Sequence, residues 1–292
     1  MRKIIYILFT FTCLQLASCI RNSDKDERTE KEDSILRVTE DSVYNMTPNA
    51  LKMINKGLRD AKDSLTYYDY YLQLSKFVAM QTQTSTTKYA DKVICFAKKQ
   101  KETPRINGLL ATAYSIKSSN LYIYQKNTDE SIKLAKQAYQ LLMKSDNKDY
   151  TPDLLANLAD VYISKNNIPE ASYYYRRALF LVDSLKLPSE KNVSLYMGLA
   201  HIYQILGDNK QAERYYYETE KHFHCLKPNM KVYYLSNAGS FYYYDEHYHK
   251  SLYFFLRMER ILSERGMKGS FDDYLGKLDL ADIYLNLGEV NK

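Results

Sequence analysis

The chain has 292 residues, which is enough for two compact domains or for one elongated array of repeats. Hydrophobic residues make up 45% of it and charged residues 26%, so a buried core can form and global disorder is disfavoured. The formal net charge of +6 is not gathered in a dense block of Lys and Arg, which argues against nucleic-acid binding. Low counts of Gly and Pro favour helices, whereas the 30 Tyr are moderate strand formers, and the periodicity of the sequence decides for an all-α chain.

The first nineteen residues predict an export signal that is not part of the fold. Two basic residues precede an apolar run over 4–16, which is too short to span a bilayer comfortably. The residues that follow, Leu16-Ala17-Ser18-Cys19, resemble the bacterial lipobox, in which the Cys becomes the lipidated first residue of the mature protein. A plain cleaved signal and an uncleaved anchor are the alternatives. The plain signal prefers a small residue three before the cut, and Leu16 is not small.

The lipobox resemblance implies that residues 1–18 are a lipoprotein signal peptide and that Cys19 carries a lipid. We therefore expect the protein in the bacterial cell envelope, anchored at the outer membrane and facing the periplasm or the cell surface. No later apolar run reaches the length of a transmembrane helix. Two thiols then remain, Cys95 and Cys225, which we expect to be unpaired and partly buried because they lie three repeats apart.

Residues 19–46 predict a charged, flexible tether between the lipid and the folded body. The first half of this segment is almost entirely charged or small and polar, so it buries too little apolar surface to offset the entropy of ordering. We expect the folded body to occupy 47–292. A helix over 48–63 should open it and cap its N-terminal end.

The sequence from residue 48 onward is repetitive. Three segments carry Leu-Ala-x-x-Tyr, a turn, and then parts of a small-x-x-x-aromatic-x-x-small pattern; they begin at Leu158, Leu199 and Leu280. Weaker copies place the same position at residues 77, 118 and 238, so successive copies are 39 to 42 residues apart. Such near-equal spacing indicates stacked helical hairpins.

This pattern resembles the tetratricopeptide repeat, whose unit is a hairpin of two helices, A and B. Small residues let the two helices touch, and large residues fill the space between neighbouring hairpins. The resemblance implies an all-α, right-handed superhelical solenoid with a period of about 40 residues in place of the family's 34. It contains five full repeats and half of a sixth, whose A helix covers 274–287 and leaves Leu280, Ile283 and Leu287 uncovered. This last helix is either a cap or a sign that the chain is a fragment, which the abrupt end favours.

In this family the A helices line a groove with their repeat positions 2, 5, 9, 12 and 13, where position 7 is Leu158 in the third repeat. Carried over residue by residue, the resemblance implies a polar, tyrosine-rich groove formed by Asn120, Tyr124, Asp153, Asp160, Ser194, His201, Gln204, Tyr233, Ser240, Tyr243 and Tyr244. Tyr offers contact area and a hydroxyl at low entropic cost, which suits peptide binding. The alternative is that several of these Tyr pack between repeats, as we expect for Tyr175 and Tyr216 of the B helices.

Catalytic and metal-binding motifs are not legible in the sequence. It has no nucleophile elbow, phosphate-binding loop or zinc-protease motif, so we expect neither an enzyme nor a cofactor. The pairs His222/His224 and His247/His249 are spaced i, i+2, which diverges on a helix, and we expect no metal site. One subclass of the family grips acidic tails with Lys and Asn, but Tyr124 stands at one of its Lys positions, so that specificity is not carried over.

The leading hypothesis is a membrane-anchored scaffold or adaptor that binds a protein or peptide in its groove. One alternative is the extracytoplasmic sensor part of a larger transcriptional regulator, of which this chain is a fragment. A second alternative is a glycan-binding lipoprotein. The lack of Trp, a favoured sugar-stacking residue, and of large insertions disfavours that last role.

Overall fold

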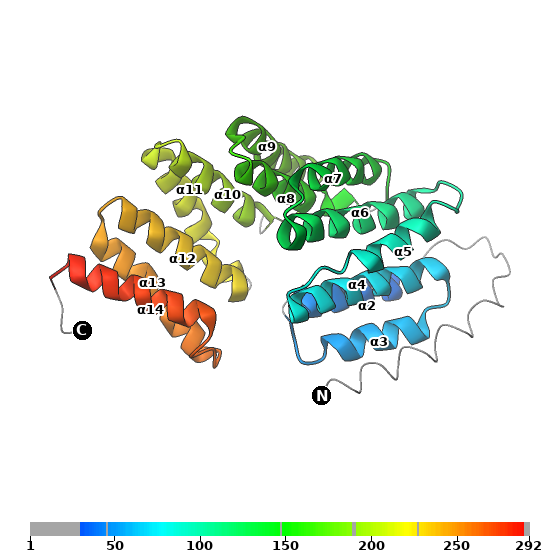
Figure 1. The fold of residues 1–292 in the computed structure, drawn as a ribbon, viewed down its shortest axis with the longest axis horizontal. Coiled ribbons are helices and arrows are strands. Elements are labelled where there is room, and N and C mark those ends of the chain that lie inside the picture. Colours follow the sequence, from blue (N-terminus) through cyan, green and yellow to red (C-terminus); the bar gives the residue numbers. More distant parts are fainter. Residues whose placement is uncertain (1–29, 45, 147, 189–190, 227, 289–292) are drawn as a thin grey trace. The chain divides into compact units, whose positions relative to one another are not determined.

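The computed structural model describes residues 30–288 except 45, 147, 189–190 and 227, and these residues form helices and turns with no strand (Figure 1). The prediction of an all-helical chain is confirmed. The signal peptide and Cys19 lie outside the described residues. In chain order the helices are α2 (Glu30–Tyr44), α3 (Ala50–Asp60), α4 (Ser64–Thr82), α5 (Thr87–Ala97), α6 (Pro104–Gln125), α7 (Thr128–Met143), α8 (Thr151–Ser164), α9 (Ile168–Ser184), α10 (Asn192–Ile205), α11 (Asn209–Lys221), α12 (Pro228–Tyr244), α13 (Tyr248–Glu264) and α14 (Phe271–Asn286), with short 3-10 helices at Lys148–Tyr150 and Phe223–Cys225.

The chain divides into two compact units, Met1–Ile35 and Leu36–Lys292, and the second unit holds a stack of helical hairpins. Five pairs follow one another, α4–α5, α6–α7, α8–α9, α10–α11 and α12–α13, and α14 packs on α13 (Figure 1). We call the first helix of each pair, and α14, an A helix, and the second a B helix. Successive A helices from α4 to α12 touch one another directly, so they form a continuous layer. The surface given by repeat positions 2, 5, 9, 12 and 13 of this layer is named the A-helix face below.

Part of the expected tether is a helix. Helix α2 buries Leu36, Thr39 and Val43, whose spacing of three and four residues places them on one face. Val43 belongs to a small core with Ala50 and Ile54 of α3. The expectation of a flexible segment is therefore wrong for 30–44, because a sparse apolar stripe finds partners that offset the entropy of ordering. Residues 19–29 lie outside the described part of the chain.

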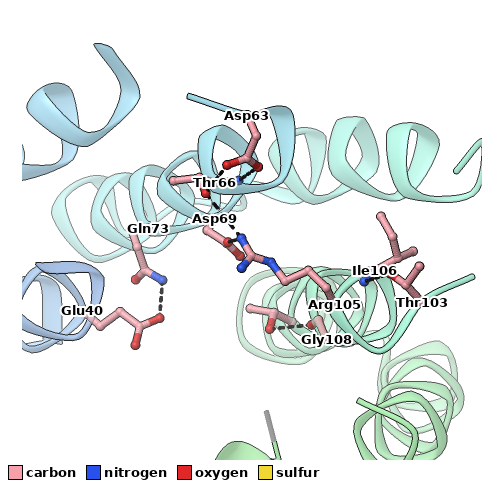
Figure 2. A network of polar contacts seen from close by, with 10 residues as sticks. Glu40, Asp63, Thr66, Asp69, Gln73, Thr103, Arg105, Ile106 and Gly108 are labelled. Atoms are coloured by element: carbon pink, nitrogen blue, oxygen red, sulfur yellow. Dashed lines mark hydrogen bonds and ion pairs between the residues drawn. The ribbon is translucent and has the colours of Figure 1, made fainter. Parts of the chain in front are cut away.

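Polar contacts attach α2 and α6 to α4 (Figure 2). The amide of Gln73 donates a hydrogen bond of 2.8 Å to Glu40 of α2. The guanidinium of Arg105, on α6, donates to Asp69 at 2.9 Å in a largely buried ion pair. The N-terminal end of the stack thus contains both α2 and α3, whereas a single helix over 48–63 was predicted there.

The turns between A and B helices share one design in three hairpins. The A helix is followed by a residue with positive φ, which is Lys126, Asn166 or Gly207. The next residue is an Asn or Asp whose side chain accepts a hydrogen bond from the backbone three residues on, as at Asn167 and Asp208. The turn that the repeat pattern predicts between its two helices is therefore present in these hairpins.

Small and aromatic residues meet inside each hairpin as predicted. Ala159 on α8 and Ala171 on α9 have no solvent-exposed surface, which lets the two helices approach closely. The aromatic position of the B helix is buried, with Tyr175 only 3% exposed and Tyr216 likewise in the core. These residues join the hairpins into continuous apolar cores.

The open face of α14 is not the predicted one. Leu280, at 7% exposure, and Ile283 are buried against the preceding hairpin, and Leu287 is partly buried there. The uncovered stripe carries Leu278, at 57% exposure, and Leu285. The period of the sequence was right, but it did not show which of the two apolar stripes of α14 faces α13. Leu278 and Leu285 stand at repeat positions 5 and 12, which are groove positions in the other A helices.

Both described thiols are free. Cys95 and Cys225 are unpaired, as expected, but they are exposed and not partly buried. Cys95 follows Val93 and Ile94, which occupy the buried side of α5, so the thiol falls on the other side of the helix. Over the described ranges, no helix combines the length and the apolar character needed to cross a membrane.

Candidate functional site

The A-helix face carries exposed ionisable groups around repeats three to five. Asp160 on α8 and His201 on α10 are exposed to solvent at the same repeat position. Desolvation nevertheless raises the pKa of Asp160 and lowers the pKa of His201. Tyr233 on α12 combines 56% exposure with a pKa that desolvation raises. Exposed ionisable groups that neighbouring atoms partly desolvate make this part of the face the candidate groove.

A tyrosine of the B layer reaches the carboxylate in this groove. The hydroxyl of Tyr175, on α9, donates a hydrogen bond to Asp160. Its ring passes directly over Gly198 of α10, where an added Cβ would lie 2.1 Å from the ring carbon Cζ. The missing side chain at Gly198 therefore gives the Tyr175 hydroxyl its path between two A helices to the A-helix face.

Two further tyrosines lie near this pair. Desolvation is the largest cause of the raised pKa of Tyr233, and the charge of the Asp160 carboxylate is the second cause. The two residues stand on A helices two repeats apart. Desolvation is also the largest cause of the raised pKa of Tyr175, which lies well above its usual value. The Asp160 carboxylate is the next cause, and Tyr233 and Tyr122 raise this pKa further. We name Asp160, Tyr175, Tyr233 and Tyr122 the tyrosine–carboxylate site. The raised pKa values of Tyr175 and Tyr233 keep their hydroxyls protonated at neutral pH, so both can donate hydrogen bonds.

A cavity of about 250 Å³ opens next to the tyrosine–carboxylate site. It lies among α12, α13 and α14 and is lined by Val232, Tyr233, Ser236, Met258, Arg265, Asp272 and Leu275. Tyr233 belongs to both the cavity and the site. The candidate groove thus offers a carboxylate and aromatic faces, and through Tyr233 it adjoins a cavity whose lining is mixed, with Val232, Met258 and Leu275 beside Arg265 and Asp272.

One predicted groove residue is part of the interior. Asn120 is buried, and its side-chain oxygen accepts hydrogen bonds from the backbone N–H of Thr86 at 2.6 Å and from its hydroxyl at 3.2 Å. Its amide donates to the carbonyl of Ile116 at 2.9 Å. Thr86 precedes α5 and makes no side-chain cap of its own, so Asn120 supplies that contact from the next hairpin. Asn120 is therefore a structural residue and does not line the groove.

Three other predicted groove residues are engaged by neighbouring elements. The hydroxyl of Tyr124 donates to the carbonyl of Ala79 on α4 at 3.2 Å. Asp153 forms an ion pair of 2.8 Å with Lys191. Gln204 accepts a hydrogen bond of 3.4 Å from the buried Tyr216. All three side chains remain partly exposed, so their place in the groove stays a prediction. Their contacts with neighbouring elements restrict their side-chain movement.

The remaining predicted residues lie towards the ends of α10 and α12. Ser194 and Ser240 are half-buried. Tyr244 is exposed, whereas Tyr243 is half-buried and its hydroxyl accepts a hydrogen bond of 3.3 Å from Asn286 of α14. Tyr244 is the better available of the two to a ligand.

Sequence reasoning missed the contributions of Tyr175 and Tyr122 to the groove. Tyr175 was correctly assigned to the core, but its hydroxyl extends beyond the core to the A-helix face. The available signal was Gly198, since a Gly in a helix interior is unfavourable and often marks a close approach.

A second depression lies on the opposite layer. It has a volume of about 580 Å³ and is lined by Ile168, Pro169, Ser172, Tyr173, Arg176, Arg177, Phe180 and Leu206. It is open and mostly apolar, and the groups that could orient a ligand are partly engaged: Arg176 donates to the Tyr203 hydroxyl at 3.0 Å, and Arg177 lies over the ring of Phe180. The groove therefore has the more convergent polar chemistry. Within the described ranges no three His, Cys, Asp or Glu side chains gather as metal ligands would.

Paired helices stacked with a period near 40 residues define a helical-repeat solenoid. Sequence profiles of the tetratricopeptide repeat match residues 109–180 and 193–218, which covers α6 to α9 partly or wholly and most of α10 and α11. The chain thus carries tetratricopeptide repeats, as its sequence pattern predicted. No curated protein matches the chain.

Solved structures share this architecture. A Rap protein complexed with Competence and Sporulation Factor is 15% identical, with a TM-score of 0.64 over 89% of this chain and 73% of that one. The apo quorum sensor NprR from B. thuringiensis is 14% identical, with a TM-score of 0.58 over 90% and 73%. BtubC from P. vanneervenii is 18% identical, with a TM-score of 0.58 over 75% and 85%. At such identities the likeness shows a common solenoid fold.

Proposed function

We propose that this protein is a scaffold that binds a protein or peptide on its A-helix face. The observation that carries the proposal is the tyrosine–carboxylate site, where a desolvated but accessible carboxylate is surrounded by tyrosine hydroxyls and rings. Tyr suits such surfaces because it combines large contact area with a polar tip. A similar structure, NprR in complex with its cognate peptide NprX, has a TM-score of 0.57 at 15% identity and supports a peptide ligand.

The same site supports binding over catalysis. The raised pKa of Tyr175 keeps its hydroxyl protonated, so it donates a hydrogen bond and is a poor base or nucleophile. The fold by itself does not decide this point, because aspartyl phosphate phosphatase F from Bacillus subtilis also has it, with a TM-score of 0.57 at 13% identity. The proposal therefore rests on the groups present in the groove.

Site-specific cross-linking in the native cell tests the proposed function. A photoreactive amino acid replaces Tyr233 in the groove or, as the matched control, Tyr173 on α9, which is similarly exposed at 59%. We expect a discrete set of adducts, identified by mass spectrometry, from position 233 and not from position 173. Adducts that are identical at both positions, or their absence at position 233, would contradict a ligand on the A-helix face.

We propose further that the protein is anchored to the bacterial outer membrane through a lipid on Cys19. The support is the lipobox-like Leu16-Ala17-Ser18-Cys19 after a short apolar run. Cys19→Ala should abolish incorporation of radiolabelled palmitate and block signal cleavage. Cys13→Ala, within the signal, is the control and should leave both unchanged. Equal labelling of the two variants would refute the anchor.

A sensor role within a larger regulator is the second candidate. Its support is the exposed apolar stripe of α14, with Leu278 and Leu285, on which a further part of a longer chain would pack. The apo quorum sensor NprR shows that a sensor role occurs on this fold. The coding sequence beyond codon 292 tests it. A membrane helix and a DNA-binding domain in the same frame would support the sensor role, and an immediate stop codon would count against it.

A further inference from the structure

The A-helix face has one sign of charge. From α4 to α12 its positions carry Asp153 and Asp160, and no Lys or Arg occupies any of them, although Arg265 lines the cavity beside Tyr233. The chain as a whole has a formal net charge of +6, so this acidic bias is opposite to that of the molecule. A negative groove in a basic protein favours a cationic partner and repels an acidic one.

Three carboxylates of the stack are neutralised from a neighbouring hairpin. Lys191 pairs with Asp153 at 2.8 Å, Lys250 with Glu213 at 3.0 Å, and Arg257 with Glu220 at 2.9 Å, in each case 37 or 38 residues apart. These pairs bridge successive repeats in register. Asp153 on the A-helix face is thus already neutralised from within the chain.

Asp160 makes no such pair within the described part of the chain. Its hydrogen-bond partner is the hydroxyl of Tyr175, which fixes the carboxylate but brings no positive charge. A carboxylate has two oxygens with about four acceptor positions, so capacity remains on the side that faces the groove. Desolvation already opposes its charge, and an incoming cation would relieve that penalty.

Tyr233 adds a second element of recognition. It lies close enough to Asp160 to feel its charge, and its exposed ring lines the cavity of about 250 Å³ beyond it. An aromatic face beside a carboxylate stabilises a Lys or Arg side chain from two sides, by ion pairing and by cation–π attraction. The cavity then provides a place for the next apolar side chain of an extended ligand.

We propose that the tyrosine–carboxylate site holds a Lys or Arg side chain of a basic peptide segment on Asp160, with an adjacent apolar side chain in the cavity beside Tyr233. This inference rests on the proposed function, because it names the ligand class of the same face. An acidic segment would meet only like charge at Asp160. A wholly apolar segment would bury its carboxylate without a counter-charge, which is unfavourable.

The test uses the full chain in detergent and a positional-scanning library of fluorescein-labelled hexapeptides, read by fluorescence anisotropy. Each pool that fixes Arg is compared with the pool that fixes citrulline, which has nearly the same shape without the charge. We expect at least one Arg pool to bind about tenfold more tightly than its citrulline counterpart. Asp160→Asn should abolish that difference.

Asp129→Asn is the matched control, because it removes the same charge from α7, outside the A-helix face. It should leave the Arg preference intact. Thermal unfolding followed by circular dichroism checks that Asp160→Asn folds. Should that variant unfold, the salt dependence of the wild type decides, since added NaCl should weaken binding of the Arg pool and spare the citrulline pool.

The outcomes separate this inference from the proposed function. Equal binding of Arg and citrulline pools that Tyr233→Ala abolishes would overturn the basic-ligand inference and leave the groove as the binding face. An Arg preference that survives Asp160→Asn would also overturn it. If no Arg pool binds, the inference falls, and cross-linking at position 233 still decides whether the face binds a protein.

Discussion

Replacing Gly198 by Ala tests the path that Tyr175 takes to the groove. An added Cβ would lie 2.1 Å from Cζ and 2.5 Å from the hydroxyl oxygen of Tyr175, well inside contact distance. The ring is buried and cannot swing aside without disturbing its neighbours, so overpacking should cost about 1–3 kcal/mol. Loss of the hydrogen bond to Asp160 adds about 1 kcal/mol, and the better helix propensity of Ala returns about 1 kcal/mol. The net expectation is a destabilisation of about 1–3 kcal/mol.

Urea denaturation followed by far-ultraviolet circular dichroism measures this change. Gly108→Ala is the matched control, since Gly108 also lies inside an A helix, and the nearest atoms to an added Cβ would be Asp146 Oδ1 at 3.3 Å and Ser145 Cβ at 3.6 Å. That variant should be neutral or more stable by up to about 1 kcal/mol. Combining Gly198→Ala with Tyr175→Leu should remove most of the clash, which would appear as a non-additive double-mutant cycle. Equal stability of the two alanine variants would refute the placement of the ring over Gly198.

Three further predictions concern individual residues. Asn120→Ala should lower the free energy of unfolding by about 1–3 kcal/mol, because the buried N–H of Thr86 loses its acceptor; an unchanged urea midpoint would contradict the structural assignment. Desolvation lowers the pKa of His201 in the folded state, so the unfolded state binds the proton more readily, and stability is lost as the pH falls below about 6.5. His201→Gln should flatten that loss in denaturation curves between about pH 7 and pH 5. On α14, Leu280→Ala should lower the free energy of unfolding by about 2–4 kcal/mol, and Leu278→Ala by less than about 0.5 kcal/mol. The reverse order would mean that Leu280 is on the uncovered side of α14, as the sequence predicted.

Much of the hairpin architecture follows from sequence because its determinants are local and repeated. Ala159 and Ala171 mark the close approach of two helices, and the Asn and Asp that follow each A helix mark the turns. Because all copies share one spacing, the strongly matching copies fix the alignment of the weaker ones. The same periodicity assigns Asp160, His201 and Tyr233 to one face, and all three side chains are exposed.

The features that sequence reasoning missed depend on contacts between repeats or on sparse signals. Helix α2 has few apolar residues within an acidic segment, and its burial depends on α3 and α4, which come later in the chain. Asn120 occupies a groove position by its number, but the uncapped end of α5 draws it inside. On α14 two apolar stripes fit the pattern equally well, and only the packing on α13 distinguishes Leu280 from Leu278.

The passage of Tyr175 over Gly198 means that positions 160, 175 and 198, on three different helices, are inherited as a unit. A relative that acquires any side chain at 198 must withdraw the ring, and the carboxylate at 160 then loses its donor. Substitutions at these three positions should therefore covary among homologues, even though only one of them belongs to the A-helix face. Ligand preference in this protein can thus change through Gly198, which acts on the groove only through the ring of Tyr175.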